Sequence, residues 1–172
     1  MDFLIRRIVE DDWAPYRDIR LAMLREIPMA YSETPEEVLG RGEADWRERA
    51  AAGGSTPGIR FAAITSAGEW IGSMGSYAGA DGPTLMGVYV APAFRGDAAG
   101  VTSALMAAVE DWAMGYSTSL RLDVHESNAR AIASYNKRGY VATGNTKPYP
   151  PDPTHVELEM VKQLSSAPRE HG

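Results

Sequence analysis

The most regular hydrophobic pattern in the chain lies between residues 101 and 112. Apolar residues recur there at i, i+3, i+4, i+7, i+8 and i+11, which places them on one face of an α-helix. They are Val101, Ala104, Leu105, Ala108, Val109 and Trp112. We therefore expect an amphipathic helix whose apolar face lies in the core.

Alternation of apolar and polar residues predicts strands on both sides of this helix. Residues 120–125 alternate leucine or valine with polar residues, and residues 156–160 alternate apolar residues with glutamate. Two runs further upstream are joined by Ser66-Ala67-Gly68, a short hairpin signal. The predicted strands are residues 3–8, 59–65, 69–77, 84–90, 120–125 and 156–160, with a loop over residues 78–83.

Two helices are predicted in the N-terminal third of the chain. The first follows a cluster of three acidic residues, carries apolar residues at helical spacing and ends at Pro28. The second opens at Pro35, with Ser32 or Thr34 as its N-cap. Its helix propensity is low around Gly40 and Gly42, and the helix is expected to end by Gly53-Gly54.

A fourth helix is predicted to begin at Asn128, a favourable N-cap, and to end at Gly139. The complete order is then strand, two helices, three strands, helix, strand, helix and strands. The central strand–helix–strand unit predicts one parallel pair, whereas the hairpins on either side predict antiparallel strands. The fold class is therefore mixed α/β.

Composition limits the size and the class of the protein. The chain has 172 residues, of which 44% are hydrophobic and 23% charged, so we expect a single domain over residues 1–164 and a frayed tail over 165–172. There is no cysteine, which excludes disulfides and thiolate metal sites and fits a cytoplasmic location. No apolar run approaches the ~18 residues of a membrane helix.

Charge and motifs narrow the chemistry further. The net charge of −6 disfavours nucleic-acid binding and mildly favours cationic amines, although an ordinary acidic surface explains it equally well. The three histidines lie far apart, so we expect no metal site. The signature motifs of serine hydrolases, dinucleotide-binding domains and P-loop proteins do not occur.

The segment VYVAPAFRGDAAG, residues 88–100, carries the clearest candidate chemistry. It runs from a predicted strand into a predicted helix, where backbone N–H groups and the positive end of the helix suit a pyrophosphate. Gly96 and Gly100 would let the backbone approach a ligand, and Arg95 would add a cation. An ordinary strand-to-helix turn could carry the same residues.

Two segments together resemble the GCN5-related N-acetyltransferase family. The family pattern V-x-P-x-x-R-G-x-G-x-G or A is followed downstream by N-x-x-A-x-x-x-Y-x-x-x-G-F or Y. The matching residues are Val90, Pro92, Arg95, Gly96, Gly100, Asn128, Ala131, Tyr135, Gly139 and Tyr140. The resemblance covers about residues 84–141 and implies a mostly antiparallel sheet with a central splayed parallel pair and helices on both faces.

The resemblance implies acetyl-CoA as the cosubstrate and assigns residues to it. The backbone of Arg95, Gly96, Asp97, Ala98, Ala99 and Gly100 would bind the pyrophosphate, and that of Val88, Tyr89 and Val90 would hold the pantetheine arm and the acetyl carbonyl. Asn128 would contact the same arm, and Tyr135 would protonate the departing thiolate. A core aromatic residue is the plain alternative for Tyr135.

Two residues of the loop depart from the family pattern. Alanine donates an amide N–H as glycine does, so Ala98 is harmless if its φ is negative and its methyl group points away from the phosphate. Asp97 adds a like charge close to the pyrophosphate and is expected to weaken binding modestly. We expect a working loop.

Asp123 is the candidate general base. It precedes Asn128 by five residues, where the ribosomal-protein alanine acetyltransferases of this family carry a glutamate, and Glu126 and Glu33 are fallbacks. A solvated or arginine-paired strand residue is an equally good interpretation of Asp123.

The family resemblance also points to Tyr31, Ser32, Glu33 and the loop 78–83 as the wall of the acceptor site. The proline-rich segment 147–155 is expected to be a stiff connection between two antiparallel strands, with a place in that wall as the alternative.

These observations together predict an acetyl-CoA-dependent N-acetyltransferase that moves the acetyl group directly to a primary amine, on a small molecule or a peptide N-terminus. A non-catalytic acyl-CoA-binding or partner-binding module on the same fold is the first alternative. An enzyme with another acyl donor is the second. A homodimer is compatible with the sequence but no patch supports it.

Overall fold

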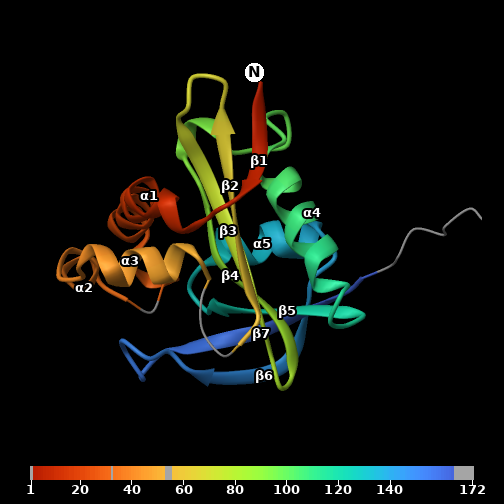
Figure 1. The fold of residues 1–172 in the computed structure, drawn as a ribbon. Helices are drawn as coiled ribbons and strands as arrows, with labels where there is room; N and C mark the ends of the chain where they lie inside the picture. The colour runs from red at the N-terminus through yellow and green to blue at the C-terminus, as the bar shows by residue number, and fades with distance from the viewer. Residues whose placement is uncertain (1, 32, 53–55, 165–172) are drawn as a thin grey trace, which may run out of the picture.

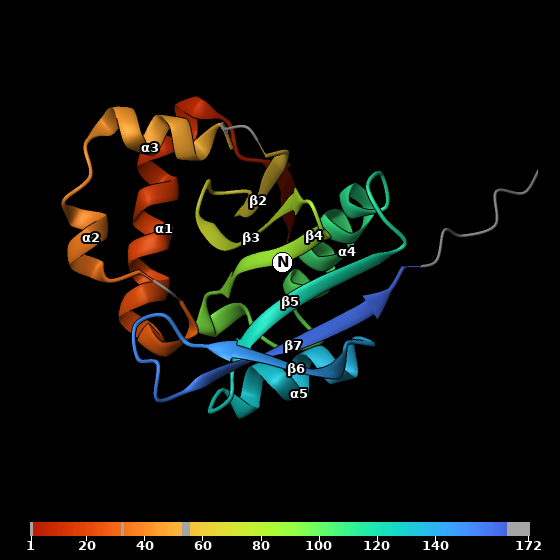
Figure 2. The ribbon, with the colours of Figure 1, turned by 90° about the horizontal axis from the view of Figure 1, so that it is seen from below.

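The computed structural model describes residues 2–31, 33–52 and 56–164. Seven strands form one sheet in the order β1-β2-β3-β4-β5-β7-β6, with helices on both faces (Figures 1 and 2). The strands are β1 Phe3–Arg7, β2 Gly58–Thr65, β3 Trp70–Gly79, β4 Gly82–Val90, β5 Ser119–His125, β6 Val141–Pro148 and β7 Val156–Gln163. The helices are α1 Trp13–Glu26, α2 Pro35–Leu39, α3 Glu43–Ala50, α4 Val101–Ala113 and α5 Ala129–Lys137, with single 3-10 turns η1 Glu10–Asp12, η2 Pro28–Ala30 and η3 Pro92–Phe94.

The sheet separates two hydrophobic cores. Helices α1 to α3 cover one face and α4 covers the other (Figure 2). Neighbouring residues of β2 contribute to opposite cores, Ala62 and Ile64 to that of α1 and Ala63 to that of α4, because successive side chains of a strand point to opposite faces. The predicted mixed sheet with helices on both faces is confirmed.

Two predicted elements differ from the structure. The second helix is two helices, α2 and α3, which break between Leu39 and Glu43, where glycine lowers helix propensity. Its N-cap is Thr34, whose hydroxyl accepts the N–H of Glu37 at 3.2 Å. The expected loop 78–83 shrinks to two residues, because β3 and β4 pair as far as Gly79 and Gly82 and ladder hydrogen bonds need no side chain. Ser32, the predicted helix stop at Gly53-Gly54 and the predicted tail 165–172 lie outside the described residues.

Strands β4 and β5 form the predicted parallel pair and then separate. Only Thr84 and Leu85 of β4 pair with β5, opposite Arg121 and Leu122. The later residues of β4 continue to pair with β3 on the other side, as far as Val90. The splay therefore leaves one edge of β4 without a strand partner. Within the described residues, no helix has the length and hydropathy needed to span a bilayer.

Candidate active site

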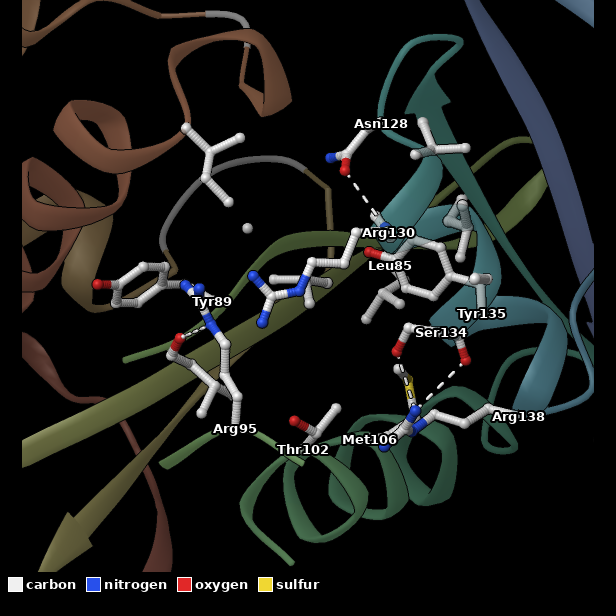
Figure 3. Close-up of a pocket in the computed structure, with 18 of the residues that line it drawn as sticks. Leu85, Tyr89, Arg95, Thr102, Met106, Asn128, Arg130, Ser134, Tyr135 and Arg138 are labelled. Carbon is white, nitrogen blue, oxygen red and sulfur yellow. Dashed lines mark hydrogen bonds between the residues drawn. The ribbon is translucent and has the colours of Figure 1, made fainter. Parts of the chain in front are cut away.

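A cavity of about 440 Å³ lies where β4 and β5 separate (Figure 3). Residues from β4, the loop after it, α4, β5, α5 and the segment after α1 line it. Ten predicted site residues meet there: Tyr31, Val88, Tyr89, Val90, Arg95, Gly96, Asp97, Asp123, Asn128 and Tyr135. The predicted residues Ala98, Ala99, Gly100 and Glu33 are described but do not line it.

The loop 95–100 has the backbone that an anion-binding turn requires. Gly96 and Gly100 have φ of +98° and +74°, a region that favours glycine. Beyond the adjoining residues of the chain, no heavy atom lies within 4 Å of where a Cβ would stand on either. Among the described non-glycine residues only Ala52 has a positive φ. The φ of Ala98 is therefore not positive, which is the first of the two conditions under which alanine at this position would not disturb phosphate binding. Gly100 is also the N-cap of α4, whose positive end faces this turn. The loop therefore fits a pyrophosphate.

Asp97 is tied to α5 across the loop. Its carboxylate accepts a hydrogen bond from the Lys137 ammonium and lies 3.8 Å from the Arg138 guanidinium. The hydrogen bond from Lys137 lowers the pKa of Asp97. The like charge that the sequence places beside the pyrophosphate is thus balanced by two cations.

The Arg95 side chain is not the free cation that the sequence predicts. Its Nε donates to the Val90 carbonyl at 2.7 Å, and its guanidinium lies 2.6 Å from the Glu26 carboxylate of α1. Hydrogen bonding to Arg95 lowers the pKa of Glu26. The guanidinium takes this position because the splay leaves the edge of β4 without a strand partner and a carboxylate lies beside it.

Arg130 is a site residue that the sequence reasoning missed. Figure 3 shows its side chain extending into the cavity from the first turn of α5. The ion pairs found around the cavity in the described part of the chain join Glu26 to Arg95, Asp97 to α5 and Asp123 to Lys147, and none includes Arg130. A cation near a helix N-terminus opposes the helix dipole, and that electrostatic conflict is the signal that could have identified it as an anion ligand.

Tyr135 presents its hydroxyl to the cavity (Figure 3). Its half-buried ring packs edge-on against Tyr140, with ring centroids 5.8 Å apart. Burial raises the pKa of Tyr135, so the phenol keeps its proton at neutral pH. The hydroxyl can therefore donate to a group bound in the splay.

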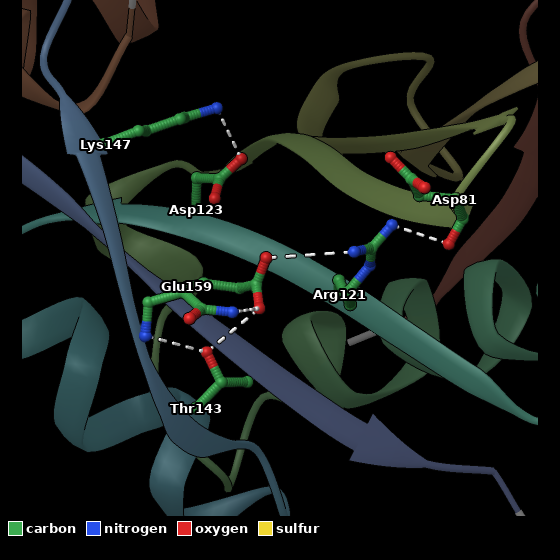
Figure 4. A network of polar contacts seen from close by, with 7 residues as sticks. Asp81, Arg121, Asp123, Thr143, Lys147 and Glu159 are labelled. Carbon is green, nitrogen blue, oxygen red and sulfur yellow. Dashed lines mark hydrogen bonds and ion pairs between the residues drawn. The ribbon is translucent and has the colours of Figure 1, made fainter.

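Asp123 lines the cavity but is paired. Its carboxylate accepts a hydrogen bond from Lys147 of β6 at 2.7 Å (Figure 4). The same ammonium lies 3.4 Å from Glu157 of β7. Nearby, Arg121 donates to the Asp81 carbonyl at 2.6 Å and lies 3.8 Å from Glu159. The pairing that was the alternative for Asp123 is therefore present, with lysine in place of arginine.

The two fallback bases are also engaged. Glu33 lies 2.6 Å from Arg20 and 2.8 Å from Arg41, and its side chain is only 12% exposed. Burial acts to raise the pKa of Glu33, but the two arginines outweigh it and hold that pKa below its usual value. Glu126 is 3.1 Å from Nδ1 of His155. Glu33 therefore offers no free charge to a cationic acceptor.

The proline-rich segment connects two strands and contacts Tyr31, one of the residues expected in the wall of the acceptor site. Lys147 and Pro148 end β6, and residues 149–155 link β6 to β7, which pair antiparallel as expected. Within it, Tyr149 is buried, packs edge-on against His125 at 4.7 Å and donates to the Tyr31 carbonyl at 3.0 Å.

Comparison with known proteins gives a family and a fold. The model of the acetyltransferase (GNAT) family matches residues 12–140. An acetyltransferase of the GNAT family from Streptococcus pneumoniae superposes with a TM-score of 0.77 at 19% identity, covering 95% of this chain and 100% of that one. The PaiA N-acetyltransferase from Thermoplasma acidophilum, in complex with coenzyme A, gives 0.67 at 18% identity over 95% and 100%.

A third structure is named for its substrate. The spermidine N-acetyltransferase from Vibrio cholerae, in complex with CoA and spermine, gives a TM-score of 0.71 at 15% identity over 94% of this chain and 95% of that one. At these identities the three likenesses establish the fold alone. No curated protein matches the chain significantly.

Proposed function

The chain belongs to the acetyltransferase (GNAT) family, and from this premise we propose that it moves the acetyl group of acetyl-CoA to a primary amine, on a small molecule or a peptide N-terminus, by direct attack in a ternary complex. The family makes the chain an acetyl-CoA-dependent acetyltransferase. The observation that carries the proposal is the cavity in the splay, where the Tyr135 hydroxyl faces the unpaired edge of β4.

The cofactor-binding part of the proposal rests on the loop 95–100. Its amide groups and the start of α4 would hold the pyrophosphate, and Arg130 would add a cation from α5. Asn128 caps α5 by accepting the Ala131 N–H at 3.3 Å and lines the same cavity, where it would contact the pantetheine arm. Bound acetyl-CoA supplies an activated thioester.

Tyr135 is the proposed general acid. A phenol with an ordinary pKa near ~10 donates to a thiolate whose conjugate acid is near ~8.5 only through a hydrogen bond that is already formed, so position matters more than acidity. The raised pKa of Tyr135 keeps it protonated until that donation, and the splay places its hydroxyl beside the cavity rather than in the core.

Asp123 is the proposed general base. An ammonium acceptor must lose a proton before it attacks, and the Asp123 carboxylate would take that proton through a relaying water, since aspartate is short. Lys147 orients the carboxylate from β6. The chain contains no cysteine for an acyl-enzyme intermediate, which supports direct attack.

The proposal is tested by titrating the protein with acetyl-CoA in a calorimeter and then measuring thiol release in the same samples against a panel of amines. Micromolar binding with amine-dependent release is the expected result and identifies the acceptor class. Binding without release from any amine would favour the non-catalytic acyl-CoA-binding module. The absence of binding would contradict the function assigned to the loop.

A further inference from the structure

Tyr31 is fixed against the β4 edge of the cavity. Its side chain is 8% exposed, and its hydroxyl donates to the Val88 carbonyl at 2.7 Å. Val88 lies beyond Leu85, the last residue of β4 that pairs with β5. The Tyr31 hydroxyl therefore takes the place of a strand partner inside the splay.

The backbone and ring of Tyr31 are held from two other directions. Tyr149, on the connection between β6 and β7, donates to the Tyr31 carbonyl at 3.0 Å. The Arg20 guanidinium lies 5.4 Å from the centre of the ring, and Glu33 fixes that guanidinium at 2.6 Å. The ring cannot turn aside without losing the bond to Val88, so Tyr31 is a rigid wall.

The wall faces the position that the acyl group would occupy. Under the proposed function, Tyr135 donates to the thioester sulfur, and the acyl chain begins one atom beyond it. Tyr31 and Tyr135 line the same cavity, so a chain that extends from the thioester enters the space that the Tyr31 ring borders. Ile27 and Met86 also line the cavity.

We propose that Tyr31 limits the length of the acyl donor and makes the protein selective for acetyl-CoA over longer acyl-CoAs. This inference rests on the proposed function. A chain of several methylenes would need the volume that the ring occupies, and the contacts to Val88, Arg20 and Tyr149 prevent the ring from leaving it. Packed protein walls yield little to added volume, so the discrimination is steric.

The test compares acetyl-, butyryl- and hexanoyl-CoA as ligands and as donors. Binding is measured by calorimetry without acceptor, and transfer by thiol release with the best amine. For the unmodified protein, hexanoyl-CoA should bind at least about tenfold more weakly than acetyl-CoA. Tyr31→Ala should reduce that ratio at least about fivefold. Tyr31→Phe, which keeps the ring but loses the bond to Val88, should give a ratio between those of the parent and Tyr31→Ala.

Further variants keep the test decisive. Tyr31→Leu shortens the wall while it keeps an apolar side chain, and it replaces Tyr31→Ala if thermal melting shows that the alanine variant does not fold. Tyr116→Ala removes an aromatic residue that is 50% exposed and does not line the cavity, so its selectivity should equal that of the parent.

The outcomes separate this inference from the function on which it rests. Equal binding of hexanoyl-CoA and acetyl-CoA by the unmodified protein would overturn the inference, as would an unchanged ratio in folded Tyr31→Ala or Tyr31→Leu. Both results leave acetyl transfer intact. Failure to bind any of the three acyl-CoAs would instead overturn the proposed function, and this inference with it.

Discussion

Exchanging glycine and alanine within the loop 95–100 tests whether backbone conformation or residue size governs cofactor binding. Gly100→Ala places a Cβ on a residue whose φ is +74°. Ala98→Gly restores the glycine of the family pattern at a residue whose φ is not positive. The two variants are matched, because each changes one methyl group in the same turn.

The expected size of the Gly100→Ala effect follows from its surroundings. Beyond the adjoining residues of the chain, no heavy atom lies within 4 Å of the new Cβ, so the effect comes from the backbone and not from a clash. A left-handed L-residue costs about 1–2 kcal/mol. If the turn holds, that cost appears as lost stability, about 2–8 °C in Tm for a chain of this size. If the turn relaxes, the amides move and acetyl-CoA binding weakens by up to about thirtyfold.

Ala98→Gly should behave differently. The new glycine gains nothing in the folded loop and adds freedom to the unfolded chain, so stability should fall by about 0.4–1 kcal/mol. Acetyl-CoA affinity should change by less than about threefold, since the amide N–H is kept and less than ~0.7 kcal/mol is at stake.

Denaturant unfolding and calorimetric titration of both variants provide the measurement. The reasoning is wrong if Gly100→Ala alters neither stability nor affinity. It is also wrong if Ala98→Gly tightens acetyl-CoA binding tenfold, because the alanine methyl group would then obstruct the phosphate.

Three further changes test the site. Tyr135→Phe should lower kcat about 100-fold or more while the acetyl-CoA Kd changes less than about threefold, by thiol release and calorimetry; an unchanged kcat would remove Tyr135 as the acid. Asp97→Asn should free Lys137 and tighten acetyl-CoA binding about two- to tenfold at low salt, with a smaller gain at ~0.5 M salt; weaker binding would contradict this. Because the pKa of Glu33 is lowered, its ion pairs stabilise the fold above the ordinary glutamate pKa of about 4.3, and this contribution is lost as the pH falls through the lowered value. Glu33→Gln should therefore lose less stability than the parent between about pH 6 and pH 3. Parallel curves of unfolding free energy against pH for the two proteins would exclude Glu33 as a contributor.

Local signals in the sequence predicted most of the elements that frame the site. The spacing of apolar residues predicted α4, alternation predicted β5, and Asn128 was identified as the cap that begins α5. These signals are reliable because periodicity and capping act between residues three or four positions apart. The glycines of the loop after β4 were informative for the same reason, since a positive φ is a property of one residue.

Tertiary structure alone decided what the charged and hydroxyl groups of the site do. Arg95 turns to Glu26 instead of the loop, Tyr31 reaches Val88 over 57 positions, and Asp123 meets Lys147 over 24. For each of these side chains, several other residues of the chain have the charge or the hydrogen-bonding group needed to pair with it. Which partner it takes depends on the splay of β4 from β5 and on the segments that fold over that splay. This arrangement joins residues far apart in the sequence, so no local pattern of residues can predict it.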